Sequence, residues 1–206
     1  MKAIKVKLIG INYLLIHNDR AADPLDIYSK RLKEISSKRN KTEADHELMA
    51  RIEWESALYL MDGEVKIPSR NIERCIEEGG KKNKKGKDIR KFIEISDTYI
   101  SLKYSGTPIK NIPIPKTVDD IPMKELNAIF AAREHFDRRS VKVGQAKIMR
   151  TRPIFKDWSL AFELQYVDGS INFNEIEKAC EIAGSDIGLC EHNINRYGRF
   201  TVKIIK

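Results

Sequence analysis

The first apolar residues of the chain alternate with lysines. Ile4, Val6 and Leu8 are separated by Lys5 and Lys7. A period of two is typical of a half-buried strand, because successive side chains of a strand point to opposite faces. The pattern predicts an opening strand with one apolar face and one basic face.

The last third of the chain repeats this alternation on both sides of a helical pattern. Apolar residues occupy every second position over residues 160–166 and again over 200–204. Between them, residues 173–183 carry apolar side chains at helical spacing, and Gly184 follows, where a glycine commonly ends a helix. We therefore expect the chain to end with a strand, a helix and a strand.

Two further helices are indicated by their start signals. Thr42 with Asp45 three residues later has the form of a capping box and predicts a helix over residues 43–61. Ser69 favours the N-cap position and predicts a second helix, which the glycines at 79–80 would end.

The middle of the chain has the features of an insertion. Several prolines follow residue 105 and disfavour regular structure, and residues 123–135 could then form a helix. A strand, a helix and a strand toward each end of the chain indicate a split β-α-β arrangement. The fold class expected is therefore α+β, with a ferredoxin-like (RRM-like) core and inserted loops, as a single domain over residues 1–206 with a thumb-like insertion at about 105–148.

Composition narrows the classes of function. The chain of 206 residues is 41% hydrophobic and 33% charged, with a net charge of +8, so a folded protein with a polyanionic partner is favoured. Three cysteines without a C-x-x-C pair suggest neither a disulfide framework nor a zinc site. No signal peptide or membrane-spanning run is evident, and we expect a cytoplasmic protein without membrane contact. Motifs for nucleotide hydrolysis, dinucleotide binding and acyl transfer are missing, so no cofactor or metal is expected.

The positive charge is concentrated in two stretches. Residues 81–91 hold seven basic residues and one acid, Asp88, and we expect them to form a loop. Residues 138–152 hold six basic residues and no acid, and their interleaved apolar residues predict an extended basic ribbon. A solvated charged surface is the plain alternative, but two such stretches favour phosphate binding, whose affinity comes from counterion release. The phosphate-contact candidates are Lys84, Lys85, Arg90, Lys142, Lys147, Arg150 and Arg152.

The segment of residues 188–200, before the last strand, combines cations, planar rings and glycines. Such a loop can contact phosphates and stack on unpaired bases, which favours single strands over a duplex. The alternative is an ordinary connecting loop whose aromatic residues pack against the core. The candidates here are His192, Arg196, Tyr197 and Arg199.

Three segments carry a family resemblance: residues 8–15, residues 67–74 (IPSRNIER) and residues 188–200. In this order, they resemble the opening strand and turn, the segment that opens the first helix and the C-terminal glycine-rich loop of the RAMP (repeat-associated mysterious protein) superfamily. The chain departs from the family pattern at Ser69-Arg70-Asn71, at Asn12-Tyr13 and in the low glycine content of the last loop.

Within the superfamily, the chain looks most like the backbone subunits of CRISPR effector complexes, which polymerise along a guide RNA. The resemblance implies an RRM-like core with a thumb, self-association along a strand, contact with other effector subunits and a role in antiviral defence. A phage or plasmid-borne relative with another nucleic-acid task fits equally. RNA is favoured over DNA on this resemblance.

Catalysis is a separate question, centred on the loop of residues 17–26. The resemblance implies two kinds of RNA cleavage, one with an aspartate of this loop and one with a histidine as general acid or base. The candidates are His17, Asp19 and Asp23, but turn-forming aspartates in a polar loop are the favoured interpretation. Binding is therefore preferred to catalysis. A RAMP-type endoribonuclease and a protein-interaction subunit that docks an acidic partner remain the alternatives.

Overall fold

A computed structural model describes residues 1–110, 135–191 and 197–205 of this chain. The described residues contain five α-helices and three antiparallel sheets, which confirms the α+β class. Proximity in space divides the chain into two compact units. The first unit comprises Met1–Leu14, Glu64–Lys110 and Phe155–Lys206, and the second Leu15–Gly63 and Asn111–Ile154. The expected single domain with one insertion stays a prediction.

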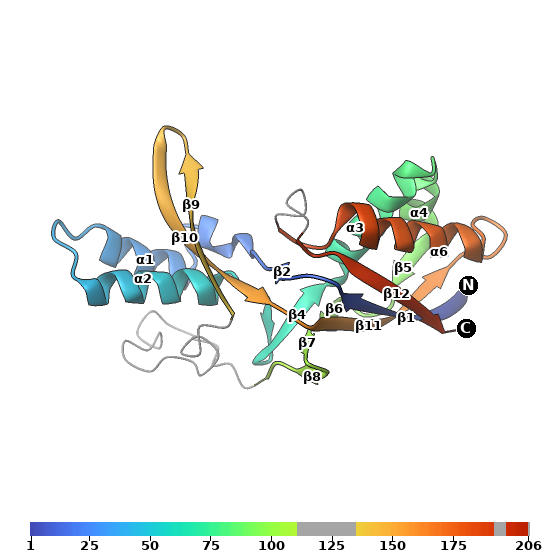
Figure 1. Cartoon of the computed structure of the whole chain (residues 1–206), viewed down its shortest axis with the longest axis horizontal. Helices are drawn as coiled ribbons and strands as arrows, with labels where there is room; N and C mark the ends of the chain where they lie inside the picture. Colours follow the sequence, from blue (N-terminus) through green and yellow to red (C-terminus); the bar gives the residue numbers. More distant parts are fainter. Residues whose placement is uncertain (111–134, 192–196, 206) are drawn as a thin grey trace. The chain divides into compact units, whose positions relative to one another are not determined.

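The first unit is built on the main sheet, whose strand order is β12-β1-β11-β7-β8, with β5 also paired to β11 (Figure 1). The pairings of β1 with β11, β1 with β12 and β11 with β5 are antiparallel. The strands of this unit are β1 (Lys2–Gly10), β4 (Glu64–Pro68), β5 (Ile93–Ile95), β6 (Tyr99–Ser101), β7 (Lys103–Tyr104), β8 (Thr107–Pro108), β11 (Trp158–Tyr166) and β12 (Phe200–Ile205). The helices are α3 (Ser69–Lys82), α4 (Gly86–Phe92), α6 (Phe173–Ile182) and the π-helical turn η2 (Ala183–Ile187).

Helices α3 and α6 lie side by side over one face of the main sheet (Figure 1). The strand alternation explains this, because Ile4, Val6 and Leu8 of β1 are buried while Lys5 and Lys7 are exposed. The strands and helix predicted for the two ends of the chain are therefore confirmed.

The second unit contains a helical hairpin and a β-hairpin. Its elements are β2 (Leu14–Leu15), which begins in the first unit, η1 (Asp19–Ala22), α1 (Ile27–Ser36), α2 (Glu43–Ser56), β3 (Leu60–Met61), β9 (Phe136–Val143) and β10 (Ala146–Phe155). The sheet order is β2-β10-β9. A cluster of Tyr28, Ile35, Leu48 and Ile52 holds α1 against α2. The predicted capping box is confirmed, since Asp45 N donates to the Thr42 side chain and the Asp45 carboxylate accepts from Thr42 N.

The prediction that residues 81–91 form a loop is wrong. Helix α3 continues to Lys82, and α4 begins at Gly86. Glycine does not end α3 because tertiary packing requires it inside the helix: a Cβ on Gly79 would lie 2.3 Å from the main-chain oxygen of Ala179 in α6. The close approach of the two helices therefore fixes this glycine.

Three predicted helix boundaries also need correction. The helix predicted over residues 43–61 ends at Ser56, and Leu60–Met61 forms strand β3. Ser69 is the first residue of α3 rather than its cap; Pro68 holds the cap position, without a side-chain hydrogen bond. The main-chain N–H of Ser69 instead donates to the carbonyl of Thr98 at 2.9 Å. Gly184 is buried within the π-helical turn, and the chain leaves that turn at Gly188, with φ of 88°. The helix expected over residues 123–135 lies outside the described residues apart from His135.

Candidate nucleic-acid interface

The β9–β10 hairpin is the basic ribbon expected from residues 138–152. Gly144, with φ of 60°, lies in its tight turn. The register places Lys147 directly opposite Lys142 and Arg150 directly opposite Arg139. Like charges directly opposite each other destabilise an antiparallel ladder, so the hairpin carries two unfavourable pairs unless counter-ions are near.

Carboxylates neutralise the arginine pair. Arg139 forms an ion pair with Asp137. Arg150 Nη1 lies 2.6 Å from Glu53 Oε1, and the other oxygen of Glu53 accepts from the main-chain N–H of Thr151 at 3.0 Å. Glu53 therefore joins α2 to β10 through both its oxygens.

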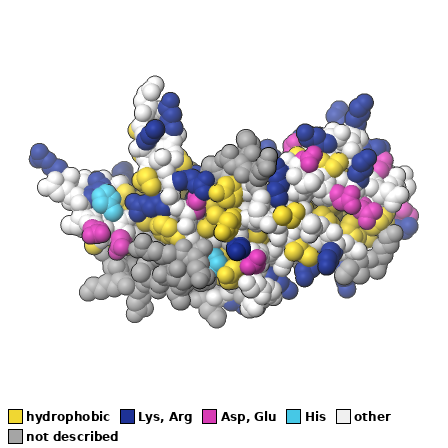
Figure 2. All heavy atoms as spheres, viewed as in Figure 1, with side chains coloured by type: hydrophobic (Ala, Val, Ile, Leu, Met, Phe, Trp, Pro, Cys, Tyr) yellow, Lys and Arg dark blue, Asp and Glu magenta, His cyan; other side chains and the backbone are white. Residues whose placement is uncertain are grey.

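The lysine pair has no such compensation. Lys142 and Lys147 are exposed, and neither forms an ion pair with any residue that the structure describes. Figure 2 shows Lys and Arg side chains projecting from this hairpin. Two ammonium groups facing each other in water form a place where an anion would relieve repulsion.

Beside this hairpin, a cavity of roughly 420 Å³ opens within the second unit; we call it the hairpin-base pocket. Its lining comprises His17, Asp19, Ala21, Ala22, Leu32, Glu53, Ser56, Ala57, Val141, Lys142, Arg150, Thr151 and Arg152. Five residues predicted from two distant stretches of sequence therefore meet here: His17, Asp19, Lys142, Arg150 and Arg152. The lining combines apolar side chains with the cations of Lys142, Arg150 and Arg152 and the carboxylates of Asp19 and Glu53.

Sequence reasoning missed Glu53, Ser56 and Thr151. Glu53 and Ser56 are three residues apart on α2 and therefore share a helix face. Their spacing in the sequence could have predicted this shared face. Thr151 had no comparable signal, because its burial and its bond to Glu53 depend on how β10 lies against α2.

Of the catalytic candidates, His17 and Asp19 are exposed and line the hairpin-base pocket, whereas Asp23 does not. The Asp23 carboxylate accepts from the main-chain N–H of Leu25 at 2.9 Å, as expected of a turn-forming aspartate. Among the residues whose positions are described, no group of three or more His, Cys, Asp or Glu side chains could hold a metal ion.

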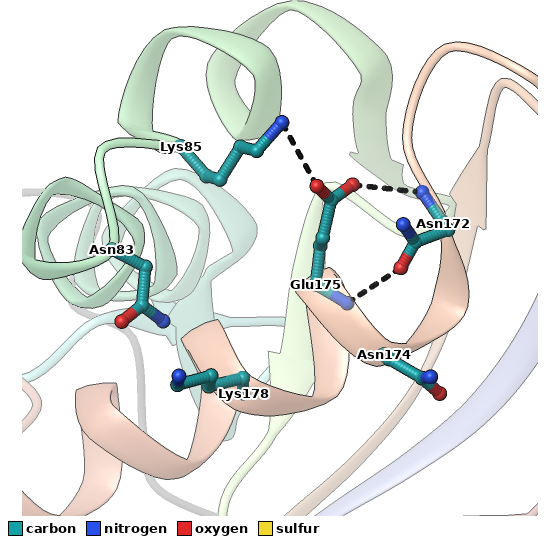
Figure 3. A pocket seen from close by; sticks show the side chains of 6 residues that line it. All are labelled: Asn83, Lys85, Asn172, Asn174, Glu175 and Lys178. Atoms are coloured by element: carbon teal, nitrogen blue, oxygen red, sulfur yellow. Dashed lines mark hydrogen bonds and ion pairs between the residues drawn. The ribbon is translucent and has the colours of Figure 1, made fainter.

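The candidates of the first unit differ in how far their charge is compensated. Lys84 and Arg90 are exposed and have no ion pair within the described part of the chain. Lys85 Nζ lies 2.8 Å from Glu175 and 3.4 Å from Asp88, and these carboxylates raise the pKa of Lys85. Figure 3 shows Lys85 pointing to Glu175, whose other oxygen accepts from Asn172 N at the start of α6. Lys85 is therefore a structural residue as much as a surface cation.

The C-terminal candidates are only partly described, since His192 and Arg196 lie outside the described residues. Tyr197 and Arg199 are half-buried. Burial raises the pKa of the Cys75 thiol to about 12. The positive charge of Arg199 partly opposes this rise, which places the guanidinium near the buried thiol. Gly198 serves the packing of the chain, because a Cβ there would lie 2.0 Å from the carbonyl of Leu189.

No family model matches this chain, and no curated protein matches it. No helix among the residues described is long and apolar enough to cross a bilayer.

Proposed function

We propose that this protein binds single-stranded nucleic acid, RNA in preference to DNA, through its phosphate backbone. The β9–β10 hairpin is the principal contact. The observation that carries the proposal is the Lys142 and Lys147 pair, directly opposite in register, exposed, and without a counter-ion in the described structure. A polyanion would supply that counter-ion and release its own condensed cations on binding.

The ferredoxin-like core and the RAMP resemblance belong to the same proposal. In chain order, the elements β1, α3, β5, β11, α6 and β12 follow the β-α-β-β-α-β plan. Their order in the sheet, β12-β1-β11-β5, with antiparallel neighbours throughout, supports this assignment. We propose that the chain acts as a repeating subunit of an oligomeric ribonucleoprotein such as a CRISPR-type effector, with self-association along the strand.

The test is the salt dependence of binding to a labelled single-stranded oligonucleotide. The log of the wild-type binding constant should fall steeply with log salt, and the double variant Lys142→Ala/Lys147→Ala should show a slope shallower by about 1.4, or about 0.7 per lost phosphate contact. Its matched control is Lys30→Ala/Lys33→Ala, which removes two exposed lysines from α1 of the same unit. Equal slopes for the two double variants would refute the hairpin as the binding element.

A second candidate function is RNA cleavage in the loop of residues 17–26. The observation that favours it is that His17 and Asp19 line the same pocket as Lys142 and Arg152. A histidine could act as general base on a 2′-hydroxyl while the cations hold the phosphate. Labelled RNA incubated with and without divalent metal tests this, since His17→Ala should abolish any cleavage that the wild type shows.

Docking of an acidic protein is a further alternative, and purification of the protein free of nucleic acid at low salt would favour it.

A further inference from the structure

The main sheet of the first unit has one face that its helices leave open. On β1, Lys5 and Lys7 point away from the side that Ile4, Val6 and Leu8 bury beneath α3 and α6. The residues paired with them in register share this open face, because directly opposite residues of an antiparallel pair point the same way.

Lys7 and Lys203 are directly opposite each other across β1 and β12. Both are exposed, and neither forms an ion pair with the residues described. The other partner of Lys7 in register is Ala161 of β11, which is also exposed. The two ammonium groups therefore stand beside a small side chain, with no carboxylate directly across from either.

Lys5 provides a contrast on the same strand. Its partner on β11 is Glu163, which places a carboxylate directly across from its ammonium group. Glu163 accepts from Ser96 Oγ at 3.2 Å and forms no ion pair with Lys5, but its charge lowers the positive potential around Lys5. No carboxylate lies directly across from Lys7 or Lys203. Opposite residues of such a pair have Cβ atoms about 4.5–5.5 Å apart, so two flexible lysines can converge on one tetrahedral anion.

We propose that Lys7 and Lys203 form a phosphate-binding site on the open face of the main sheet. The ligand class is a phosphate group of a nucleic-acid strand, held by two ammonium groups from neighbouring strands. The site uses no residue of the β9–β10 hairpin. It rests on the proposed function only in naming a nucleic-acid strand as the source of the phosphate.

The first test uses inorganic pyrophosphate as the probe, so that it does not depend on nucleic-acid binding. Pyrophosphate should raise the melting temperature of the wild type and of Lys5→Gln, and should raise that of Lys7→Gln and Lys203→Gln much less. Without the probe, Lys203→Gln should melt at or above the wild-type temperature, because the change removes a like-charge contact. Equal pyrophosphate shifts in all four proteins would overturn the site.

The second test uses a labelled single-stranded oligonucleotide at low salt. Lys7→Gln and Lys203→Gln should each weaken binding about twofold to fivefold, the range for loss of one exposed ion pair, and Lys5→Gln should weaken it less. If the Lys142/Lys147 variant loses affinity while Lys7→Gln and Lys203→Gln do not, the open-face site is wrong and the proposed function stands. If the open-face variants alone lose affinity, the site stands and the hairpin is wrong.

Discussion

Glu53 holds Arg150 at 2.6 Å and the main-chain N–H of Thr151 at 3.0 Å. One carboxylate of α2 thus fixes the base of the basic hairpin and neutralises one of its cations. The same contact lies in the lining of the hairpin-base pocket. Under the proposed function, stability and strand binding would therefore compete for Arg150.

This competition predicts opposite effects of Glu53→Gln on stability and on binding. The free energy of unfolding should fall by about 1 kcal/mol, at the low end for a charged hydrogen bond because Arg150 is partly exposed. Affinity for a single strand should rise, because Glu53→Gln removes the negative charge that neutralises the Arg150 guanidinium. Urea denaturation and fluorescence anisotropy measure the two quantities. Glu43→Gln, at an exposed position of the same helix, is the control, and a fall in both stability and affinity would contradict the competition.

Neighbouring lysines at the start of α4 should differ in their contribution to binding. Lys84 is exposed and has no ion pair in the described chain, whereas Lys85 is held by Glu175 and Asp88. Lys84→Ala should therefore weaken oligonucleotide binding at low salt more than Lys85→Ala does. Lys85→Ala should instead lower the melting temperature slightly, since it leaves Glu175 with one partner fewer. Equal losses of affinity would mean that the ion pair opens when the strand binds.

Gly79→Ala should destabilise the first unit although alanine is the better helix former. The substitution gains about 1 kcal/mol in helix propensity. Its Cβ, however, would lie 2.3 Å from the Ala179 carbonyl and 2.7 Å from the Ala183 nitrogen, and main-chain atoms cannot yield as a side chain can. A net loss of about 1–3 kcal/mol is expected from such overpacking, measured by urea denaturation. Arg74→Ala, at an exposed position of α3, should be nearly neutral, and stabilisation by Gly79→Ala would refute the close contact.

The capping box of α2 should make stability depend on pH in the acid range. Hydrogen bonds from Lys38 and Thr42 lower the pKa of Asp45 to about 2. A carboxyl whose pKa is lower in the folded state stabilises the fold at pH above its unfolded value, near 3.9, and loses this contribution as pH falls toward 2. Melting temperature measured between pH 5 and pH 2 should therefore fall less for Asp45→Asn than for the wild type. NMR titration of the Asp45 carboxyl would contradict the prediction if its pKa were near 4.

Local patterns predicted several elements because they depend on neighbours in sequence. The alternation of Ile4, Val6 and Leu8 identified β1, and the pairing of Thr42 with Asp45 identified the start of α2. The candidate site was predictable in part: the basic ribbon is the β9–β10 hairpin, and the loop of His17 and Asp19 reaches its pocket. The prediction for Gly79 failed because its environment comes from α6, about a hundred residues later in the chain.

By itself, the sequence determined the positions of β1, β11 and β12 and most of α2, α3 and α6. It also showed that positive charge concentrates in two stretches, because hydrophobic period and charge are properties of consecutive residues. Only the tertiary structure decided which lysines and arginines form ion pairs with carboxylates and which have no carboxylate partner among the described residues. Glu53 and Glu175 neutralise Arg150 and Lys85 from distant segments. Strand register, set by long-range pairing, leaves Lys142 facing Lys147. Electrostatic interaction depends on distance in space, and the order of residues does not specify that distance until the chain has folded.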